Sequence, residues 1–141
     1  MRNELVTLAL SWQKKFGVAP SITSAISEYD AAMLVGMTES QYSKTMAGRT
    51  AVSKGSDFVF NDKEYQIKAN RPSGKKGSRV TKVPKARNYQ WDKLIWILYD
   101  ESYVMQEAWE WYRADYIKAF KNKKRLSPND YRKGNRLFPK K

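Results

Sequence analysis

Residues 55–69 read Gly-Ser-Asp-Phe-Val-Phe-Asn-Asp-Lys-Glu-Tyr-Gln-Ile-Lys-Ala, and this stretch decides the fold. Its pattern predicts two short strands, near 56–61 and 64–69, that are joined by a turn. The first strand carries Asp57. The second places Gln66 and Lys68 two residues apart, so both side chains point to one face. A carboxylate, a second oxygen donor and an ammonium can together hold a hard cation and activate water beside a phosphate.

The composition is that of a folded, strongly basic domain. The chain has 141 residues, of which 41% are hydrophobic and five are Trp, so we expect a single domain, 1–141, with a real core. Lys and Arg number 27 against 14 Asp and Glu, and the net charge is 27 − 14 = +13. A charge this large implies a polyanionic partner, most often nucleic acid, with an anionic membrane surface as the alternative. No apolar run approaches the roughly 18 residues that would span a bilayer.

The chain has neither His nor Cys. Their absence excludes thiolate zinc sites, Ser-His-Asp triads, Cys-His nucleophiles and histidine-based nuclease motifs. Hydrolysis would therefore depend on carboxylates, Lys, Tyr or a metal ion. Without cysteines or a signal-peptide pattern at the N-terminus, we expect a cytoplasmic protein.

The N-terminal part, about residues 3–46, predicts three helices. The first has a helical stripe and ends at Gly17 and Pro20. The second runs from Ser21, as its cap, to about Gly36, and the third covers 39–46 with Thr38 as its cap. The stripe of the first helix is Leu5, Leu8, Ala9, Trp12 and Phe16, and the expected buried stripe of the second is Ile22, Ala25, Ile26, Tyr29 and Met33. We interpret 48–55 as a loop.

The C-terminal half alternates between basic and aromatic segments. Residues 71–87 contain no acidic residue and are interrupted by Pro and Gly, which predicts a mobile basic loop. Residues 91–99 and 103–112 predict two long strands joined by a hairpin turn, with a helix over 103–120 as the alternative. Residues 115–121 predict a helix, and about 121–141 predict a basic tail. The Trp and Tyr side chains of 89–112 are expected in the core or in a dimer interface.

The order helix, strand, strand, basic loop, strand, strand, helix, over roughly 22–120, resembles the PD-(D/E)xK nucleases, the restriction-endonuclease-like superfamily. Asp57 matches the first position of that motif, Gln66 its acidic position and Lys68 its lysine. Many members add a Glu from the preceding helix, which Glu28 fits. The resemblance implies an α/β fold with a central mixed sheet of four to five strands, flanked by helices.

Two positions depart from the family pattern. Ser56 stands where the motif has Pro, and Gln66 stands where it has Asp or Glu. An amide oxygen can ligate Mg²⁺ but brings no charge, so the affinity for the cation should drop. Glu64, on the same strand face, is a candidate to supply the missing charge. The opposite interpretation is a decayed nuclease site that binds nucleic acid without cutting it.

The resemblance implies a Mg²⁺-dependent DNA endonuclease, with Mn²⁺ as a substitute, most simply of the restriction type. A Holliday-junction resolvase or repair nuclease of the same fold is the first alternative. A non-catalytic DNA- or RNA-binding protein is the second. Asp57, the Gln66 side chain, the Ile67 backbone carbonyl and Glu28 are the expected metal ligands, and Lys68 would orient or deprotonate the attacking water. Cutting both strands at once would need a homodimer.

Nucleic-acid contacts are expected from the basic loop, which follows Lys68, and from the basic tail, which would form a second arm. Cationic side chains there would hold the backbone, and Arg87, Asn88 and Gln90 have the chemistry to contact base edges. The full set of expected DNA-binding residues is Arg71, Lys75, Lys76, Arg79, Lys82, Lys85, Arg87, Asn88, Gln90, Arg132, Lys133 and Arg136.

Overall fold

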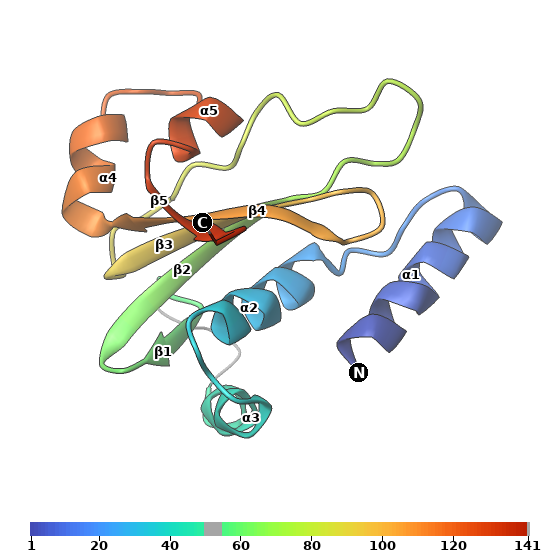
Figure 1. Cartoon of the computed structure of the whole chain (residues 1–141), viewed down its shortest axis with the longest axis horizontal. Coiled ribbons are helices and arrows are strands. Elements are labelled where there is room, and N and C mark those ends of the chain that lie inside the picture. The colour runs from blue at the N-terminus through green and yellow to red at the C-terminus, as the bar shows by residue number, and fades with distance from the viewer. Residues whose placement is uncertain (50–54, 141) are drawn as a thin grey trace.

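A computed structural model describes residues 1–49 and 55–140. It is an α/β fold in which helices flank a five-stranded mixed sheet (Figure 1). The elements, in chain order, are α1 (Arg2–Phe16), α2 (Thr23–Leu34), α3 (Glu39–Ala47), β1 (Phe58–Phe60), β2 (Lys63–Asn70), β3 (Lys93–Tyr99), β4 (Met105–Tyr112), α4 (Arg113–Phe120), α5 (Pro128–Tyr131) and β5 (Asn135–Phe138). Within the described ranges, no helix is long and apolar enough to cross a membrane.

The strands lie in the order β1-β2-β3-β4-β5. β2 and β3 are parallel, and the other three pairs are antiparallel. The β1–β2 hairpin turns at Asn61 and Asp62, whose φ angles of 50° and 62° are ones that Asn and Asp tolerate better than most residues. The two predicted strands are therefore present, although β1 is shorter than expected.

β3 is the centre of the sheet and is buried on both faces. Ile95 and Ile97 pack with α2 in one cluster, which we call the α2 core. Leu94 and Trp96 point the other way into a second cluster with α4, α5 and the segment after β2, which we call the tryptophan core. Figure 1 shows α2 on one side of the sheet and α4 and α5 on the other.

The predicted strand over 103–112 is β4, and α4 follows it directly, so the alternative of one helix over 103–120 is wrong. The predicted apolar stripe lies on α1, as expected, but Ala9 is the only residue of that stripe that is buried. Val6 packs into the α2 core in its place. In α2, Ile26 is buried as expected, while Ala25 is exposed. Most of the predicted loop 48–55, residues 50–54, lies outside the described residues.

Residues 71–87 contain no named helix or strand, as expected of a loop, but parts of this basic loop and of the basic tail pack against the rest of the fold. Val83, in the second half of the loop, is buried and bonds through its N–H to the Leu126 carbonyl at 3.0 Å. Tyr131, in the expected tail, is also buried, and its hydroxyl donates to the Pro84 carbonyl at 2.6 Å. β5 then pairs with β4. Apolar residues spaced through a basic sequence thus fix both segments to the tryptophan core.

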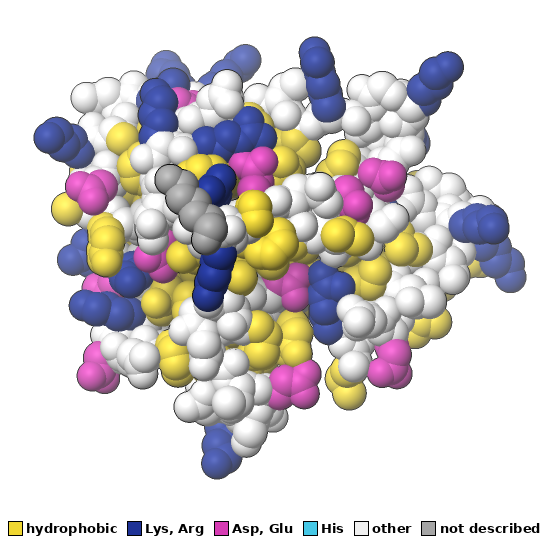
Figure 2. All heavy atoms as spheres, in the orientation of Figure 1, with side chains coloured by type: hydrophobic (Ala, Val, Ile, Leu, Met, Phe, Trp, Pro, Cys, Tyr) yellow, Lys and Arg dark blue, Asp and Glu magenta, His cyan; other side chains and the backbone are white. Residues whose placement is uncertain are grey.

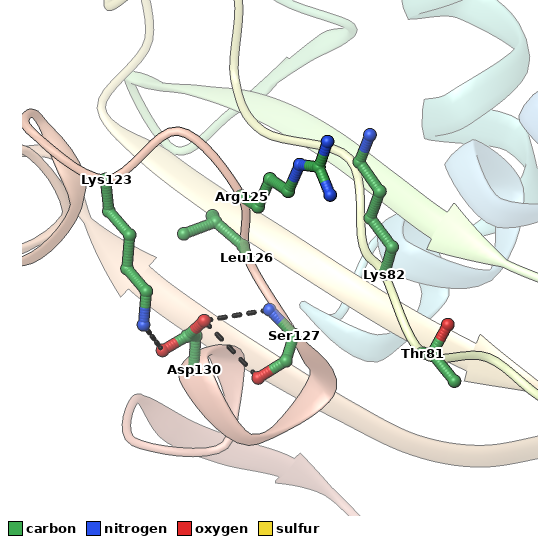
Figure 3. A pocket seen from close by; sticks show the side chains of 7 residues that line it. All are labelled: Thr81, Lys82, Lys123, Arg125, Leu126, Ser127 and Asp130. Carbon is green, nitrogen blue, oxygen red and sulfur yellow. Dashed lines mark hydrogen bonds and ion pairs between the residues drawn. The ribbon is translucent and has the colours of Figure 1, made fainter.

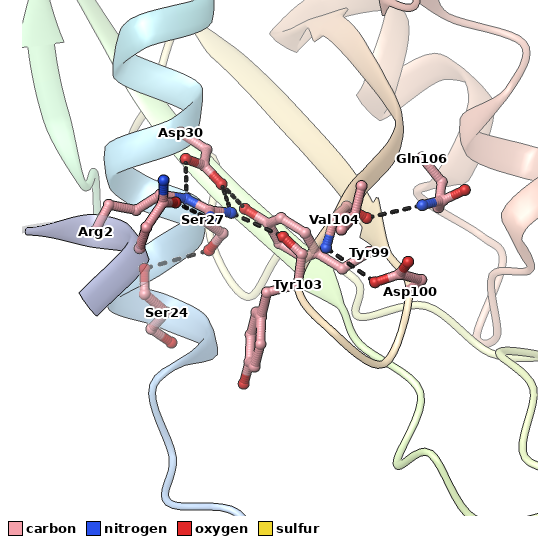
Figure 4. Close-up of polar contacts among 10 residues, drawn as sticks. Arg2, Ser24, Ser27, Asp30, Tyr99, Asp100, Tyr103, Val104 and Gln106 are labelled. Carbon is pink, nitrogen blue, oxygen red and sulfur yellow. Dashed lines mark hydrogen bonds and ion pairs between the residues drawn. The ribbon is translucent and has the colours of Figure 1, made fainter. Parts of the chain in front are cut away.

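A buried carboxylate ties the N-terminal helices to the sheet (Figure 4). Asp30 of α2 accepts two hydrogen bonds from the Arg2 guanidinium, both at 2.9 Å, and one from the Tyr99 hydroxyl at 2.6 Å. Arg2 also donates to the Tyr103 carbonyl at 2.8 Å. One carboxylate of α2 therefore joins α1 to β3 through hydrogen bonds.

We expect Asp30→Ala to lower the free energy of unfolding by about 2–4 kcal/mol, because it removes the acceptor of two Arg2 hydrogen bonds and of the Tyr99 hydroxyl. Chemical denaturation followed by circular dichroism measures the loss. Asp115→Ala removes an exposed carboxylate from the first turn of α4 and should cost about 0.5 kcal/mol. Equal losses in the two variants would contradict a structural role for the Asp30 network.

Candidate active site

Asp57 lies just before β1 and continues the hydrogen bonding of the β1–β2 hairpin. Its backbone N–H donates to the Tyr65 carbonyl at 2.7 Å. Its carboxylate Oδ2 accepts from the Ile67 backbone N–H at 2.7 Å and from the Gln66 Nε2 at 2.9 Å. The carboxylate therefore takes the position on the edge of β2 that another strand residue would otherwise occupy.

Gln66 and Lys68 share one face of β2, as the sequence predicts. They pair with Leu94 and Trp96 of β3, whose side chains enter the tryptophan core, and both are half-buried. Burial lowers the pKa of the Lys68 ammonium, the charge of Asp57 acts against that shift, and the charge of Arg87 adds to it. Lys68 thus lies within electrostatic reach of a carboxylate on one side and a guanidinium on the other.

Glu28 of α2 completes the cluster. Its carboxyl group is hydrogen-bonded to Asp57. Burial, the charge of Asp57 and that hydrogen bond raise the pKa of Glu28 to about 7, against a smaller opposing effect of Arg49. Two carboxyl groups that share one small space cannot both ionise easily, so they hold a proton between them near neutral pH.

The donor set of this cluster fits a hard cation. Glu28 and Asp57 offer carboxylate oxygens, which Mg²⁺ prefers. The carbonyl and the N–H of Ile67 point to the same edge of β2, where the Asp57 carboxylate accepts from the N–H. Gln66 turns its NH₂ toward Asp57, and rotating the amide would present its oxygen instead. Within the described ranges, no three His, Cys, Asp or Glu side chains gather into a metal site, so two carboxylates and neutral oxygens would share the cation.

The structure does not bring Glu64 to this cluster in the part of the chain that it describes. The exposed Glu64 side chain accepts from the Ser56 hydroxyl at 3.3 Å. Its backbone exchanges hydrogen bonds with Asp92, both at 2.8 Å. The carboxylate next to the Gln66 amide and the Lys68 ammonium is that of Asp57, which is in turn hydrogen-bonded to Glu28.

Three further residues surround the site, and sequence reasoning missed all of them. The Arg49 guanidinium donates to the backbone carbonyls of Ser56 and Asp57. Burial and the charge of Glu28 raise the pKa of Tyr42 to about 12, so its hydroxyl stays protonated beside that carboxyl group. Gly55 has φ 72°, and a Cβ there would lie 2.6 Å from the Gln90 side chain. No local sequence pattern marks these positions, because each acts through a contact with another segment.

The expected nucleic-acid residues divide into three groups: those that border the site, those that are exposed, and those that make intramolecular contacts. Arg87 lies within electrostatic reach of Lys68, and Asn88 and Gln90 pack against Gly55, so all three border the site. The side chains of Lys75, Lys76, Arg79, Lys82, Lys133 and Arg136 are exposed. Lys and Arg side chains project from much of the rim of the molecule (Figure 2).

The third group makes intramolecular contacts. Arg71 donates to the Glu101 carbonyl at 2.9 and 2.6 Å and lies over the Tyr103 ring. Arg132 forms a two-point ion pair with Glu107, at 2.6 and 2.9 Å. Lys85 donates to the Lys123 carbonyl at 2.8 Å. These three cations stabilise the fold, and only part of their charge is open to a ligand.

The chain matches no protein-family model, and no curated protein gives a significant match to it. The function is therefore inferred from the site itself, in which Asp57 is joined to Glu28 and Gln66, with Lys68 within electrostatic reach.

We expect the cation-free protein to lose stability as the pH rises from about 4.5 to about 7. The pKa of Glu28 rises from 4.5 to about 7 on folding, so in this window the folded state holds a proton that the unfolded state has lost. Glu28→Gln removes this cost and should raise the free energy of unfolding at pH 8 by about 1–2 kcal/mol, a value reduced for partial solvent screening.

Denaturation in EDTA at pH 4 and pH 8 measures the effect. The variant and the wild type should be nearly equal at pH 4. Glu101→Gln, at an exposed carboxylate, is the matched control and should change neither value. A Glu28→Gln protein no more stable than the wild type at pH 8 would contradict the shared proton.

Proposed function

We propose that the protein is a nuclease of the PD-(D/E)xK type, which hydrolyses phosphodiester bonds of DNA with Mg²⁺ or Mn²⁺. The observation that carries the proposal is the joining of Asp57, Glu28 and Gln66 at the open edge of β2, with the half-buried Lys68 on the same strand. The net charge of +13 supports a polyanionic substrate. A restriction-type endonuclease is the first choice, and a Holliday-junction resolvase or repair nuclease would use the same site.

The cation would polarise the scissile phosphate and make the attacking water more acidic. Glu28, Asp57, the Gln66 amide oxygen and the Ile67 carbonyl are the groups that would hold it. Attack of the water oxygen on phosphorus breaks the bond to the 3′ oxygen, which takes up a proton. The products carry 5′-phosphate and 3′-hydroxyl ends, as the resemblance implies.

Lys68 has two tasks in this proposal. Its lowered pKa brings the neutral amine closer to physiological pH than for an exposed lysine, so it can orient the attacking water and accept its proton. In its charged form it stabilises the extra negative charge of the transition state. Arg87, within electrostatic reach, adds a second positive charge for the same phosphate.

A non-catalytic nucleic-acid-binding protein is the second candidate, and Gln66 favours it. The Gln66 amide brings no charge to the cluster, and its NH₂ group can satisfy the Asp57 carboxylate by a hydrogen bond. Binding to DNA or RNA that is independent of divalent metal, with no cleavage, would support this candidate.

We expect purified protein to nick or linearise supercoiled plasmid in Mg²⁺ or Mn²⁺ and to leave it intact in EDTA. Asp57→Asn keeps an acceptor for the Ile67 N–H but removes the charge, and Lys68→Ala removes the ammonium. Each should slow cleavage by about 100-fold or more. Linear, branched and mismatched DNA, tested in parallel, separate restriction-type, resolvase and repair activities.

Lys63→Ala is the matched control, because Lys63 is exposed on the same strand and lies outside the site. It should cut like the wild type. If the wild type leaves DNA of many sequences intact with either metal, the proposal that the protein is an enzyme is refuted. Cleavage by both site variants at the wild-type rate would show that the site lies elsewhere.

We also propose that the protein works as a homodimer that pairs through α1. Leu5, Leu8, Trp12 and Phe16 form one face of this helix and are 38%, 69%, 55% and 57% exposed. An apolar stripe this long on a helix of about 22 Å is typical of an interface. Antiparallel pairing of two copies would also bring Glu4 near the start of one α1 opposite Lys15 near the end of the other.

Leu8→Glu and Trp12→Glu should convert the dimer into a monomer of 16.4 kDa, because each buries a charge in the interface. Light scattering after size-exclusion chromatography measures the mass. The monomer should nick plasmid but linearise it poorly. Val104→Glu, at another exposed apolar residue, is the control and should stay dimeric. A wild type that is monomeric at tens of micromolar would refute the pairing.

A further inference from the structure

A basic pocket of about 420 Å³ lies between the segment that follows β2 and the loop that joins α4 to α5 (Figure 3). The hydrogen bond from the Val83 N–H to the Leu126 carbonyl, at 3.0 Å, joins its two walls. The pocket is lined by Thr81, Lys82, Lys123, Arg125, Leu126, Ser127 and Asp130. Its shape is therefore set by the fold before any ligand arrives, which lowers the cost of binding.

Two of the three cationic side chains that line the pocket are available to bind a ligand. The carboxylate of Asp130 accepts from Lys123 Nζ at 2.7 Å and from the Ser127 N–H at 2.8 Å, so it neutralises Lys123. Lys82 Nζ and the Arg125 guanidinium make no hydrogen bond or ion pair within the described parts of the chain. Figure 3 shows both head groups on the same side of the pocket, directed away from Asp130. A guanidinium beside an ammonium is suited to a phosphate oxyanion.

Asn70 connects this pocket to the candidate active site. It lies on the same face of β2 as Gln66 and Lys68, because alternate strand residues share a face. Its side chain donates to the Lys82 carbonyl at 3.2 Å and accepts from Trp96 Nε1 at 2.9 Å. The Cα atoms of Lys68 and Asn70 are separated by about 7 Å along the strand. The pocket therefore lies beyond the site, toward the carboxyl end of β2, and on the same side of the sheet.

We propose that Lys82 and Arg125 bind a backbone phosphodiester of the nucleic-acid strand, a few nucleotides from the phosphate that Lys68 contacts. The proposal rests on the proposed function for the position of that strand. Each phosphodiester carries one negative charge, and successive charges of one strand are about 3.4 Å apart along the duplex axis. A strand that leaves the site along β2 therefore presents a phosphate to the pocket after a few steps. The contact fixes the register of the strand and carries no sequence preference.

The test is the binding of a fluorescent DNA duplex by Lys82→Ala/Arg125→Ala, measured by anisotropy in EDTA over a range of salt concentrations. The double variant should bind at least about 10-fold more weakly at low salt. Its slope of log K against log salt should be smaller by about 0.9, which corresponds to one lost phosphate contact. Lys14→Ala/Lys63→Ala removes the same charge from two exposed positions outside the pocket and should change affinity less than about twofold.

Two further measurements test whether the effect comes from contact with a single phosphate. The charge-preserving variant Lys82→Arg/Arg125→Lys should bind like the wild type. In the second, a single uncharged methylphosphonate replaces the phosphate at successive positions along one strand of the duplex. At one position it should weaken binding by the wild type but not by the double alanine variant. Equal affinity and slope for the wild type and the double alanine variant would overturn the proposal for the pocket, as would an equal loss in the Lys14→Ala/Lys63→Ala control.

Cleavage assays keep this outcome separate from that of the proposed function. If the wild type cuts DNA and the double alanine variant binds normally, the pocket proposal fails and the nuclease stands. If the wild type never cuts but the variant loses one phosphate contact, the pocket stands and the enzyme proposal fails.

Discussion

β3 is buried on both faces, and this burial determines how the strands beside it can pair. Ile95 and Ile97 enter the α2 core, and Leu94 and Trp96 enter the tryptophan core. Both neighbouring strands must pair with β3 in a register that keeps these faces, since a shift of one residue would exchange them. In β2 that register sends Tyr65 and Ile67 to the α2 core, which leaves Gln66 and Lys68 on the other face. The position of the polar site is therefore a consequence of core packing.

The short length of β1 is the second condition for the site. β1 ends its pairing with β2 at Tyr65, so the edge of β2 is open at Ile67. The Asp57 carboxylate satisfies the Ile67 N–H there, and α2 brings Glu28 to the same place. The Asp57 carboxylate thus completes the backbone hydrogen bonding of β2 and also belongs to the site. The same arrangement explains why two acidic groups can be held together without a cation: one accepts backbone and amide hydrogen bonds while the other keeps a proton.

The sequence predicted the sheet strands and the shared face of Gln66 and Lys68, because alternation of apolar and polar residues is a local signal. It failed where the outcome depends on distant partners. Periodicity in α1 showed which residues share a face but not that Val6 and Ala9 would pack instead of Leu8 and Trp12. Arg71 and Arg132 looked like free cations, yet each binds a group about 25 to 30 residues away in the chain. The tail lacked a strong strand pattern, and its pairing with β4 depends on the burial of Tyr131.

Gln66 changes how charge would be distributed in a working site. A Glu at this position would place a third carboxylate beside Asp57 and Glu28, and the repulsion would destabilise the protein without metal. The Gln66 amide donates to Asp57 instead, which stabilises that state and reduces the charge available to hold a cation. Lys68 supplies positive charge near Asp57, and Arg87 lies within electrostatic reach of Lys68. In our proposal the protein itself therefore provides more of the phosphate neutralisation than a site with three carboxylates would, and Mg²⁺ binds best when the substrate phosphate adds its own oxygen ligands and charge.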